Sequence, residues 1–292
     1  MTQIPQLAKS LTLSALPPPL RNELFVRYKE HRFLRFVRDR FGDRLKTVPR
    51  GEVAPPFLIE TEALMHDGDI REKRQRNIYF GSGYAMAHTI LSIIEDHGAD
   101  LTKLRRVLDF GCGSGRVIRH FRNIDGLDLY GTDANPNPVQ WDRENLPGVD
   151  FRNNQLEPPL EYQDGQFDLI YALSVFTHIP FRWQKPWLDE LYRVMAPGGY
   201  LYCTVTGANY MSQLTQEQRE IVENGGRIEL DGSSDNASYS TKVLKSWDVF
   251  QSLEEVRQIF SEKFELLYYT DYGQLESAGQ EALILRKPSA PH

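Results

Sequence analysis

Cysteine is scarce in this sequence, because only Cys112 and Cys203 occur among 292 residues. Two cysteines cannot build a disulfide framework, and their separation offers no paired ligand spacing for zinc. Long apolar runs are also lacking: no stretch approaches the length that crosses a bilayer, and none near the N-terminus is typical of a signal peptide. The sequence therefore predicts a soluble, cytoplasmic protein with no transmembrane segment and with both thiols reduced.

Basic residues are outnumbered, since 34 Lys and Arg stand against 40 Asp and Glu and give a net charge of −6. The charge is uneven: residues 1–50 hold eleven basic and four acidic residues, so the rest of the chain carries −13. An acidic body disfavours nucleic acid wrapped across the main domain, because neutralising phosphates requires a basic surface. The basic N-terminal segment leaves docking of RNA or of a protein substrate open.

That segment has the periodicity of an amphipathic helix. Apolar residues recur from Leu20 to Leu45 at roughly helical spacing, with Arg and Lys on the other face. We expect the helix to pack on the main domain; a helix that binds a membrane surface, a partner or nucleic acid is the alternative. Prolines and a glycine in residues 47–60 indicate a linker. The chain is thus divided into an N-terminal arm (1–76), a main domain (77–286) and a tail (287–292).

Strands and helices alternate in the main domain. Strands are predicted at 106–110, 129–132, 149–152, 167–172, 200–205, 264–269 and 282–286, and helices at 70–76, 84–97, 138–146, 183–195 and 252–260. This alternation implies parallel βαβ units in a doubly wound α/β sheet, with the ligand site at the carboxyl ends of the strands. Residues 206–248 are predicted to be an insertion of loops with at most one helix, too long for a simple connection.

A glycine-rich loop follows the first of these strands. Gly111, Gly113 and Gly115 open a helix, where exposed backbone N–H groups can meet an anion. A dinucleotide-binding loop would place its third glycine at position 116, and this chain has Arg116 there. The spacing therefore argues against NAD as the ligand.

Two acidic residues accompany the loop. Asp109 precedes it and would repel a pyrophosphate, but it suits a ligand that bears an ammonium group. Asp133 ends the next strand, near the separation at which a carboxylate accepts hydrogen bonds from ribose hydroxyls. Together with the glycines, these residues predict a cradle for a nucleoside that carries an amino acid, as S-adenosylmethionine does.

Four stretches resemble the class I S-adenosylmethionine-dependent methyltransferases, namely residues 107–116, 130–133, 167–170 and 191–199. The likeness covers roughly residues 77–286 and implies a Rossmann-like, seven-stranded sheet whose last strand is antiparallel. Pro197-Gly198-Gly199 would then be the turn into the fifth strand. The implied cofactor is S-adenosyl-L-methionine, and its expected contacts are Tyr79, Gly81, Asp109, Gly111, Cys112, Gly113, Gly115, Asp133, Ala134, Asn154, Gln155 and Ser174.

Two parts of this expected site rest on weaker patterns. The loop after the third strand should lie against the adenine, and it offers the amides of Asn154 and Gln155 where the family usually has an acidic residue. A polar surface turn is the alternative. The glycine-containing segment around Tyr79 is expected to fold over the methionine end of the cofactor as a lid, or else to cap a helix by aromatic packing.

On the acceptor side, residues 172–180 resemble a methyltransferase subgroup with a Ser-Val-Phe-Thr-His motif that is often associated with sugars, glycans and natural products. His178 is the candidate general base, because histidine titrates near neutral pH and a hydroxyl acceptor benefits from losing its proton. A structural hydrogen bond to the backbone is its alternative role. The insertion should build the acceptor pocket, and its candidate lining residues are Tyr210, Tyr239 and Trp247, together with Asp271 and Tyr272.

These patterns predict O-methylation of a small-molecule or saccharide acceptor. No metal site is predicted, because His66, Asp67 and Asp69 fit a turn beside a helix better than a set of ligands. An RNA or protein methyltransferase that docks through the basic arm is one alternative. A non-catalytic S-adenosylmethionine-binding regulator and a dehydrogenase are two others.

Overall fold

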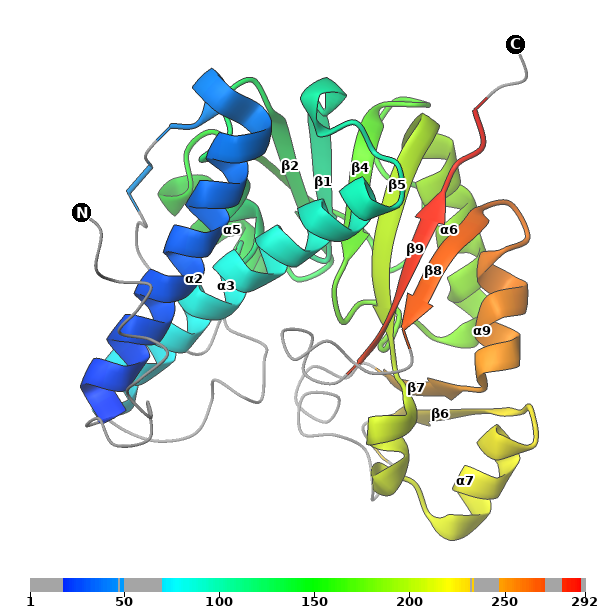
Figure 1. Ribbon diagram of the computed structural model, residues 1–292. Coiled ribbons are helices and arrows are strands. Elements are labelled where there is room, and N and C mark those ends of the chain that lie inside the picture. Colours follow the sequence, from blue (N-terminus) through cyan, green and yellow to red (C-terminus); the bar gives the residue numbers. More distant parts are fainter. Residues whose placement is uncertain are drawn as a thin grey trace.

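A seven-stranded sheet forms the centre of the protein, in the order β3-β2-β1-β4-β5-β9-β8 (Figure 1). The computed structural model describes residues 18–46, 48–49, 70–231, 233, 247–270 and 280–289. The strands are β1 (Arg106–Phe110), β2 (Asp128–Asp133), β3 (Asp150–Asn153), β4 (Phe167–Ala172), β5 (Met195–Val205), β8 (Glu265–Thr270) and β9 (Glu281–Arg286). The first five are parallel, and β9 is antiparallel to both of its neighbours. The predicted Rossmann-like α/β fold is therefore confirmed.

The sheet is covered by helices on both faces, which explains why its central strands are nearly continuous apolar runs. Successive residues of β1 point to opposite faces: Val107 joins one hydrophobic cluster and Leu108 the other. The first face is covered by α2 (Pro18–Phe41), α3 (Ile70–Asp96), α4 (Ile118–Phe121) and α5 (Pro136–Asn145), and the second by α6 (Phe181–Val194) and α9 (Leu253–Phe260). Within the described residues, no helix has the length and hydropathy needed to span a membrane.

The basic N-terminal helix α2 packs along α3 (Figure 1). Phe33 and Val37, on the C-terminal half of its apolar face, are fully buried in the same cluster as Val107 of β1, whereas Leu20 and Leu24 near its N-terminus stay exposed. Its arginines lie on the other face, where Arg27 pairs with Glu23 and Arg35 with Asp39. The hydrophobic core thus extends into the segment that the sequence assigned to an arm.

The segment around Tyr79 that was expected to form a lid is instead the middle of α3, so the predicted break between helices at 70–76 and 84–97 is wrong. Its glycines serve close packing. A Cβ at Gly81 would lie 2.5 Å from the ring of Phe25, and one at Gly83 would lie 2.3 Å from the backbone oxygen of Arg116. The missing side chains let α2 and the glycine-rich loop approach α3, and this packing outweighs the low helix propensity of glycine.

The insertion after β5 is also more regular than expected. It contains a short 3-10 helix η6 (Ala208–Gln213), α7 (Gln216–Glu223) and a separate hairpin of β6 (Arg227–Asp231) with β7 (Trp247–Gln251). Leu214, Val222, Leu230 and Phe250 form its small core. β7 is tied to the main domain, because the Val249 N–H donates to the carbonyl of Thr177 at 2.9 Å.

The turn predicted at Pro197-Gly198-Gly199 lies inside a strand. β5 begins already at Met195, and Gly198 has φ +78 where the strand changes its register against β4. The sequence therefore predicted the position of the irregularity correctly, but the strand continues through it and does not begin after it.

A methyl group added at Gly83 should destabilise the protein. At an open helical position, Gly→Ala stabilises by about 0.5–1 kcal/mol. In Gly83→Ala the new Cβ meets a backbone oxygen, so we expect the free energy of unfolding to fall by about 1–3 kcal/mol. Gly81→Ala is the matched comparison. Its free energy of unfolding should fall by less, because the ring of Phe25 can move away from the new Cβ, whereas the backbone oxygen of Arg116 cannot. A higher melting temperature for Gly83→Ala in calorimetry would contradict this packing.

Candidate functional site

The glycine-rich loop after β1 is fastened to the end of β2. The N–H groups of Gly111 and Cys112 donate to the carbonyl of Thr132 at 2.8 and 3.0 Å, and the N–H of Gly113 donates to Oδ2 of Asp133 at 2.8 Å. Gly111 and Gly113 have φ +80 and +51, which favour glycine. A Cβ at Gly113 would meet no atom within 4 Å, so the loop backbone borders open space there.

Asp133 also holds the loop that follows β3. Its second carboxylate oxygen accepts the N–H of Asn135 at 2.8 Å, while its carbonyl accepts the N–H of Asn154 at 3.0 Å and the side-chain amide of Asn153 at 2.7 Å. Burial raises the pKa of the carboxyl group, and the backbone hydrogen bonds oppose that shift. One residue therefore joins the loops after three neighbouring strands.

A cavity of about 490 Å³ opens at this edge of the sheet. That volume lies in the range of sites for nucleoside-sized ligands. The expected cofactor-site residues among its lining are Tyr79, Asp109, Gly111, Cys112, Gly113, Asp133, Ala134, Asn154, Gln155 and Ser174, and His178 lines it too. Gly81 and Gly115 do not line it: Gly81 faces Phe25, and Gly115 faces Leu146 and Asp142.

Asp109 lies deep in the cavity wall and is only 3% exposed. Its Oδ2 accepts a hydrogen bond from the hydroxyl of Tyr171 at 2.9 Å. Burial raises the pKa of Asp109 to about 7, against the hydrogen bond from Tyr171 and the positive charge of Arg116. A bound ammonium group would shift this carboxyl group towards its ionised form.

Of the two side-chain amides expected to bind adenine, those of Asn154 and Gln155, the first already makes hydrogen bonds within the protein. The side-chain oxygen of Asn154 accepts the hydroxyl of Thr132 at 2.8 Å, and its amide nitrogen donates to the carbonyl of Gln155 at 2.7 Å. The Gln155 side chain makes no hydrogen bond to any residue that the structure describes. Gln155 is therefore the better candidate of the pair.

Ser174 borders the cavity in a strained conformation, with φ 58 in a residue that is not glycine. Its N–H donates to Oγ1 of Thr204 at 2.8 Å, and its hydroxyl donates to Oε1 of Gln280 at 2.9 Å. These bonds hold the backbone just before the loop that carries His178.

His178 reaches the cavity from the loop after β4, and its side chain is 34% exposed. Its Nδ1 lies 2.7 Å from the carbonyl oxygen of Trp247 and 3.7 Å from Oδ1 of Asp248, both on β7. A carbonyl only accepts hydrogen bonds, so Nδ1 carries the proton and Nε2 keeps its lone pair in the neutral ring. The insertion thus orients the histidine through its backbone.

Other predicted pocket residues have different surroundings. Tyr210 packs against the small core of the insertion, and the ring of Trp247 is covered by the guanidinium of Arg182 at 5.2 Å. Tyr239, Asp271 and Tyr272 lie outside the described residues, as do His66, Asp67 and Asp69.

Several lining residues were not predicted as site residues. They are Phe110, Ser114, Arg116, Val117, Asn135, Leu156, Leu173, Val175, Ile179 and Trp187. Arg116 and Ser114 adjoin the glycines and could have been found from that position. Trp187 comes from α6, and only the tertiary fold brings it here: its Nε1 donates to the carbonyl of Leu156 at 3.0 Å.

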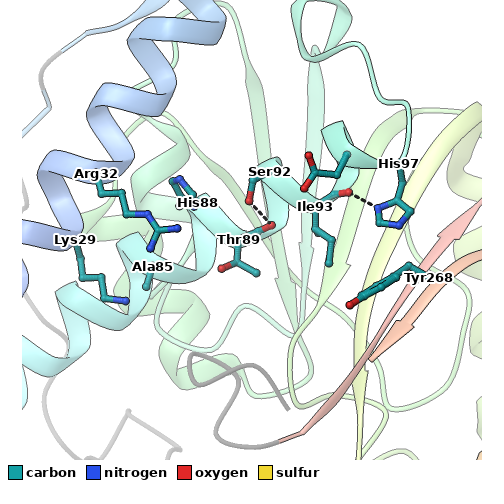
Figure 2. A pocket seen from close by; sticks show the side chains of 10 residues that line it. Lys29, Arg32, Ala85, His88, Thr89, Ser92, Ile93, His97 and Tyr268 are labelled. Atoms are coloured by element: carbon teal, nitrogen blue, oxygen red, sulfur yellow. Dashed lines mark hydrogen bonds between the residues drawn. The ribbon is translucent and has the colours of Figure 1, made fainter. Parts of the chain in front are cut away.

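A second cavity of about 490 Å³ lies between α2, α3 and β8 and shares no lining residue with the first (Figure 2). Lys29 and Arg32 reach it from α2, and His97 lies beside Tyr268 at its other end. The Nδ1 of His97 bonds the carbonyl of Ile93 at 2.7 Å, and the two rings lie 4.9 Å apart. This histidine therefore has a structural role at the end of α3.

A doubly wound sheet whose glycine-rich loop is closed by an acidic residue at the end of β2 defines a Rossmann-like nucleoside-binding domain. The family described as methyltransferase domain matches residues 76–264. The chain belongs to this class I S-adenosylmethionine-dependent methyltransferase family, and S-adenosyl-L-methionine is its cofactor. The open backbone at Gly113 and the carboxyl groups of Asp109 and Asp133 fit that zwitterionic nucleoside.

Curated relatives match over part of the chain. A probable tocopherol O-methyltransferase of Oryza sativa subsp. japonica is 36% identical over 105 residues, covering 33% of this chain and 27% of that protein. A ubiquinone biosynthesis O-methyltransferase of Acinetobacter baylyi is 23% identical, covering 42% and 52%, and a sterol 24-C-methyltransferase of Eremothecium gossypii is 28% identical, covering 57% and 45%. The chain spans about a quarter to a half of the length of these relatives.

Solved structures are similar as well. A SAM-dependent methyltransferase of Methanosarcina mazei has 18% sequence identity and a TM-score of 0.48, covering 68% of this chain and 97% of that one. An S-adenosylmethionine-dependent methyltransferase of Mesorhizobium loti has 13% identity and a TM-score of 0.49, covering 67% and 96%.

Replacing Asp133 should weaken cofactor binding strongly. Asp133→Ala removes the carboxyl group that is expected to accept the ribose hydroxyls and leaves the N–H of Gly113 without its partner, so we expect the Kd for S-adenosylmethionine to rise about 100-fold. Asp128→Ala, at the other end of β2, is the matched control and should bind normally. Calorimetry that finds similar affinities for the two variants would contradict the role of Asp133.

Cofactor affinity should rise with pH through the pKa of Asp109. With a pKa of about 7, the free carboxyl group is mostly protonated at pH 6 and mostly ionised at pH 8. An ammonium ligand favours the ionised form, so the Kd at pH 6 should be about tenfold higher than at pH 8. Asp109→Asn should bind more weakly and lose this pH dependence. Calorimetric titrations at the two pH values test the expectation, which fails if the native protein shows no change.

Proposed function

We propose that this protein transfers a methyl group from S-adenosylmethionine to an oxygen atom of a small-molecule acceptor, with His178 as the general base. The observation that carries the proposal is that His178 lines the same cavity as Asp109 and Asp133. A base and a cofactor cradle in one cavity allow the acceptor and the methyl group to meet in a fixed geometry.

When bound, S-adenosylmethionine supplies an electrophilic methyl group on a sulfonium. Asp133 would accept the ribose hydroxyls, Asp109 the ammonium group, and Gln155 the adenine amine. The apolar side chains of Leu156 and Trp187 would exclude water from the adenine. In this assignment the cofactor is bound mainly by groups that the fold already holds in place.

His178 would take the proton of an acceptor hydroxyl on Nε2. That nitrogen makes no hydrogen bond to any described residue, whereas Nδ1 is held by the carbonyl of Trp247. The carboxylate of Asp248, 3.7 Å from Nδ1, would stabilise the imidazolium that forms. This arrangement supports an acceptor atom that carries a transferable proton, which is an argument for O-methylation.

The acceptor is proposed to be a small apolar hydroxyl compound. Leu173, Val175 and Ile179, which flank His178 in sequence, give the cavity an apolar wall. Two of the curated relatives carry O-methyltransferase names, with tocopherol and ubiquinone biosynthesis as their contexts, and a third is a sterol C-methyltransferase. A saccharide fits the apolar wall less well.

His178→Ala should lower kcat about 100-fold or more, with the Kd for S-adenosylmethionine unchanged, because only the proton acceptor is removed. Asp248→Asn keeps the shape but loses the charge and should lower kcat about tenfold. Asp231→Asn, on the neighbouring strand of the hairpin, is the control. The assay measures S-adenosylhomocysteine release with hydroquinone, methyl glucoside and benzylamine as acceptors. Turnover with benzylamine alone, or full activity of His178→Ala, would overturn the proposal.

A further inference from the structure

The second cavity, which shares no lining residue with the cofactor cavity, runs along one face of α3 (Figure 2). Four of its lining residues, Ala85, Thr89, Ser92 and Asp96, recur at intervals of three and four residues and therefore share that face. The helix rises by about 16 Å between the first and the last of them. The volume of about 490 Å³ lies in the range of sites for small organic molecules. The cavity is therefore an elongated site, too large for an inorganic ion alone.

Basic side chains form one end of the second cavity. Lys29 and Arg32 are three residues apart on α2, so they lie on the same side of that helix, and Figure 2 shows both at the end where Ala85 lies. Arg32 makes no hydrogen bond or ion pair with any residue that the structure describes. His88 and the hydroxyl of Thr89 supply further hydrogen-bonding groups there. Two cations and a hydroxyl donor are complementary to an anion with several oxygen atoms, such as a phosphate group.

The opposite end of the second cavity is aromatic. The rings of His97 and Tyr268 lie 4.9 Å apart with an interplanar angle of 46°, and Tyr268 is 38% exposed. An exposed ring that is held in place offers a surface on which a planar group can stack. Asp96 ends α3 at the same end of the cavity, and its carboxylate would repel an anion there. This end therefore favours an uncharged planar ring.

The two ends together are suited to a molecule with an anion at one end and a ring at the other. We propose that the second cavity binds an organic phosphate, with the phosphate group held by Lys29 and Arg32 and a planar ring stacked on Tyr268. An inorganic anion would occupy only the basic end, and an uncharged aromatic compound only the other. Because the two cavities share no lining residue, this ligand and S-adenosylmethionine can be bound together. The site is additional to the proposed methyl transfer and does not depend on it.

The test is calorimetry of the full chain with saturating S-adenosylhomocysteine, which fills the cofactor cavity, and with 1-naphthyl phosphate, 1-naphthol and inorganic phosphate as probes. The native protein should bind 1-naphthyl phosphate at least about tenfold more tightly than either of the other two. Arg32→Met should weaken 1-naphthyl phosphate about tenfold and leave 1-naphthol unchanged, because only a charge-assisted hydrogen bond is lost. Tyr268→Leu should weaken 1-naphthyl phosphate about fivefold and leave inorganic phosphate unchanged.

Arg35→Met is the matched control, because Arg35 lies on the same helix, pairs with Asp39 and does not line the cavity. It should bind all three probes as the native protein does. An equal loss in Arg32→Met and Arg35→Met would overturn the inference, and so would equal affinity of the native protein for 1-naphthol and 1-naphthyl phosphate, or no binding of 1-naphthyl phosphate at millimolar concentration. If the melting temperature shows that Arg32→Met fails to fold, Lys29→Met removes the neighbouring charge and should give the same loss.

Discussion

The carboxyl end of β2 is the point on which the site depends. The carbonyl of Thr132 accepts two N–H groups of the glycine-rich loop, and the carboxylate of Asp133 accepts a third. Backbone N–H groups in a loop without regular structure need such partners, because an unpaired buried donor is costly. Parallel strands place their carboxyl ends at one edge, so a single residue can satisfy the loops after β1 and β3 together. The cavity is the space that these fastened loops leave open.

The glycine-rich loop is also held by side chains of α3 and α4. The hydroxyl of Tyr79 donates to the carbonyl of Ser114 at 2.6 Å, and Arg119 donates to the carbonyls of Ser114 and Gly115 at 3.1 and 2.9 Å. Beside Gly115, burial raises the pKa of Asp142 to about 9, against the positive charge of Arg119. Side chains of α3 and α4 therefore hold the loop, in addition to the end of β2.

The sheet and the cofactor cradle were predictable because their signals are local. β1 and β4 are apolar runs buried on both faces, and the predicted limits of both strands agree with the structure. The glycines, Asp109 and Asp133 lie at fixed distances along the chain. The errors involve partners far away in sequence. The glycines of α3 read as a loop because Phe25 and the backbone of Arg116, which pack against them, are not adjacent.

The hairpin of the insertion was missed for the same reason. β6 ends at Asp231 and β7 begins at Trp247. The two strands are therefore not joined by the short turn sequence from which a hairpin can be predicted. The orientation of His178 depends on a carbonyl 69 residues away, and a backbone atom leaves no trace in the sequence. The packing of α2 on α3 likewise required the fold: deleting residues 1–50 to test docking through the basic arm would also remove Phe33 and Val37 from the core.

A crystal structure with S-adenosylhomocysteine bound would test most directly the central claim that the space closed by the end of β2 is the cofactor site. We expect the ribose hydroxyls to lie on the carboxyl group of Asp133, and the amino-acid end of the ligand to lie beside Asp109 and the loop of Gly113. A ligand seated elsewhere, or one whose ribose lies away from Asp133, would contradict it.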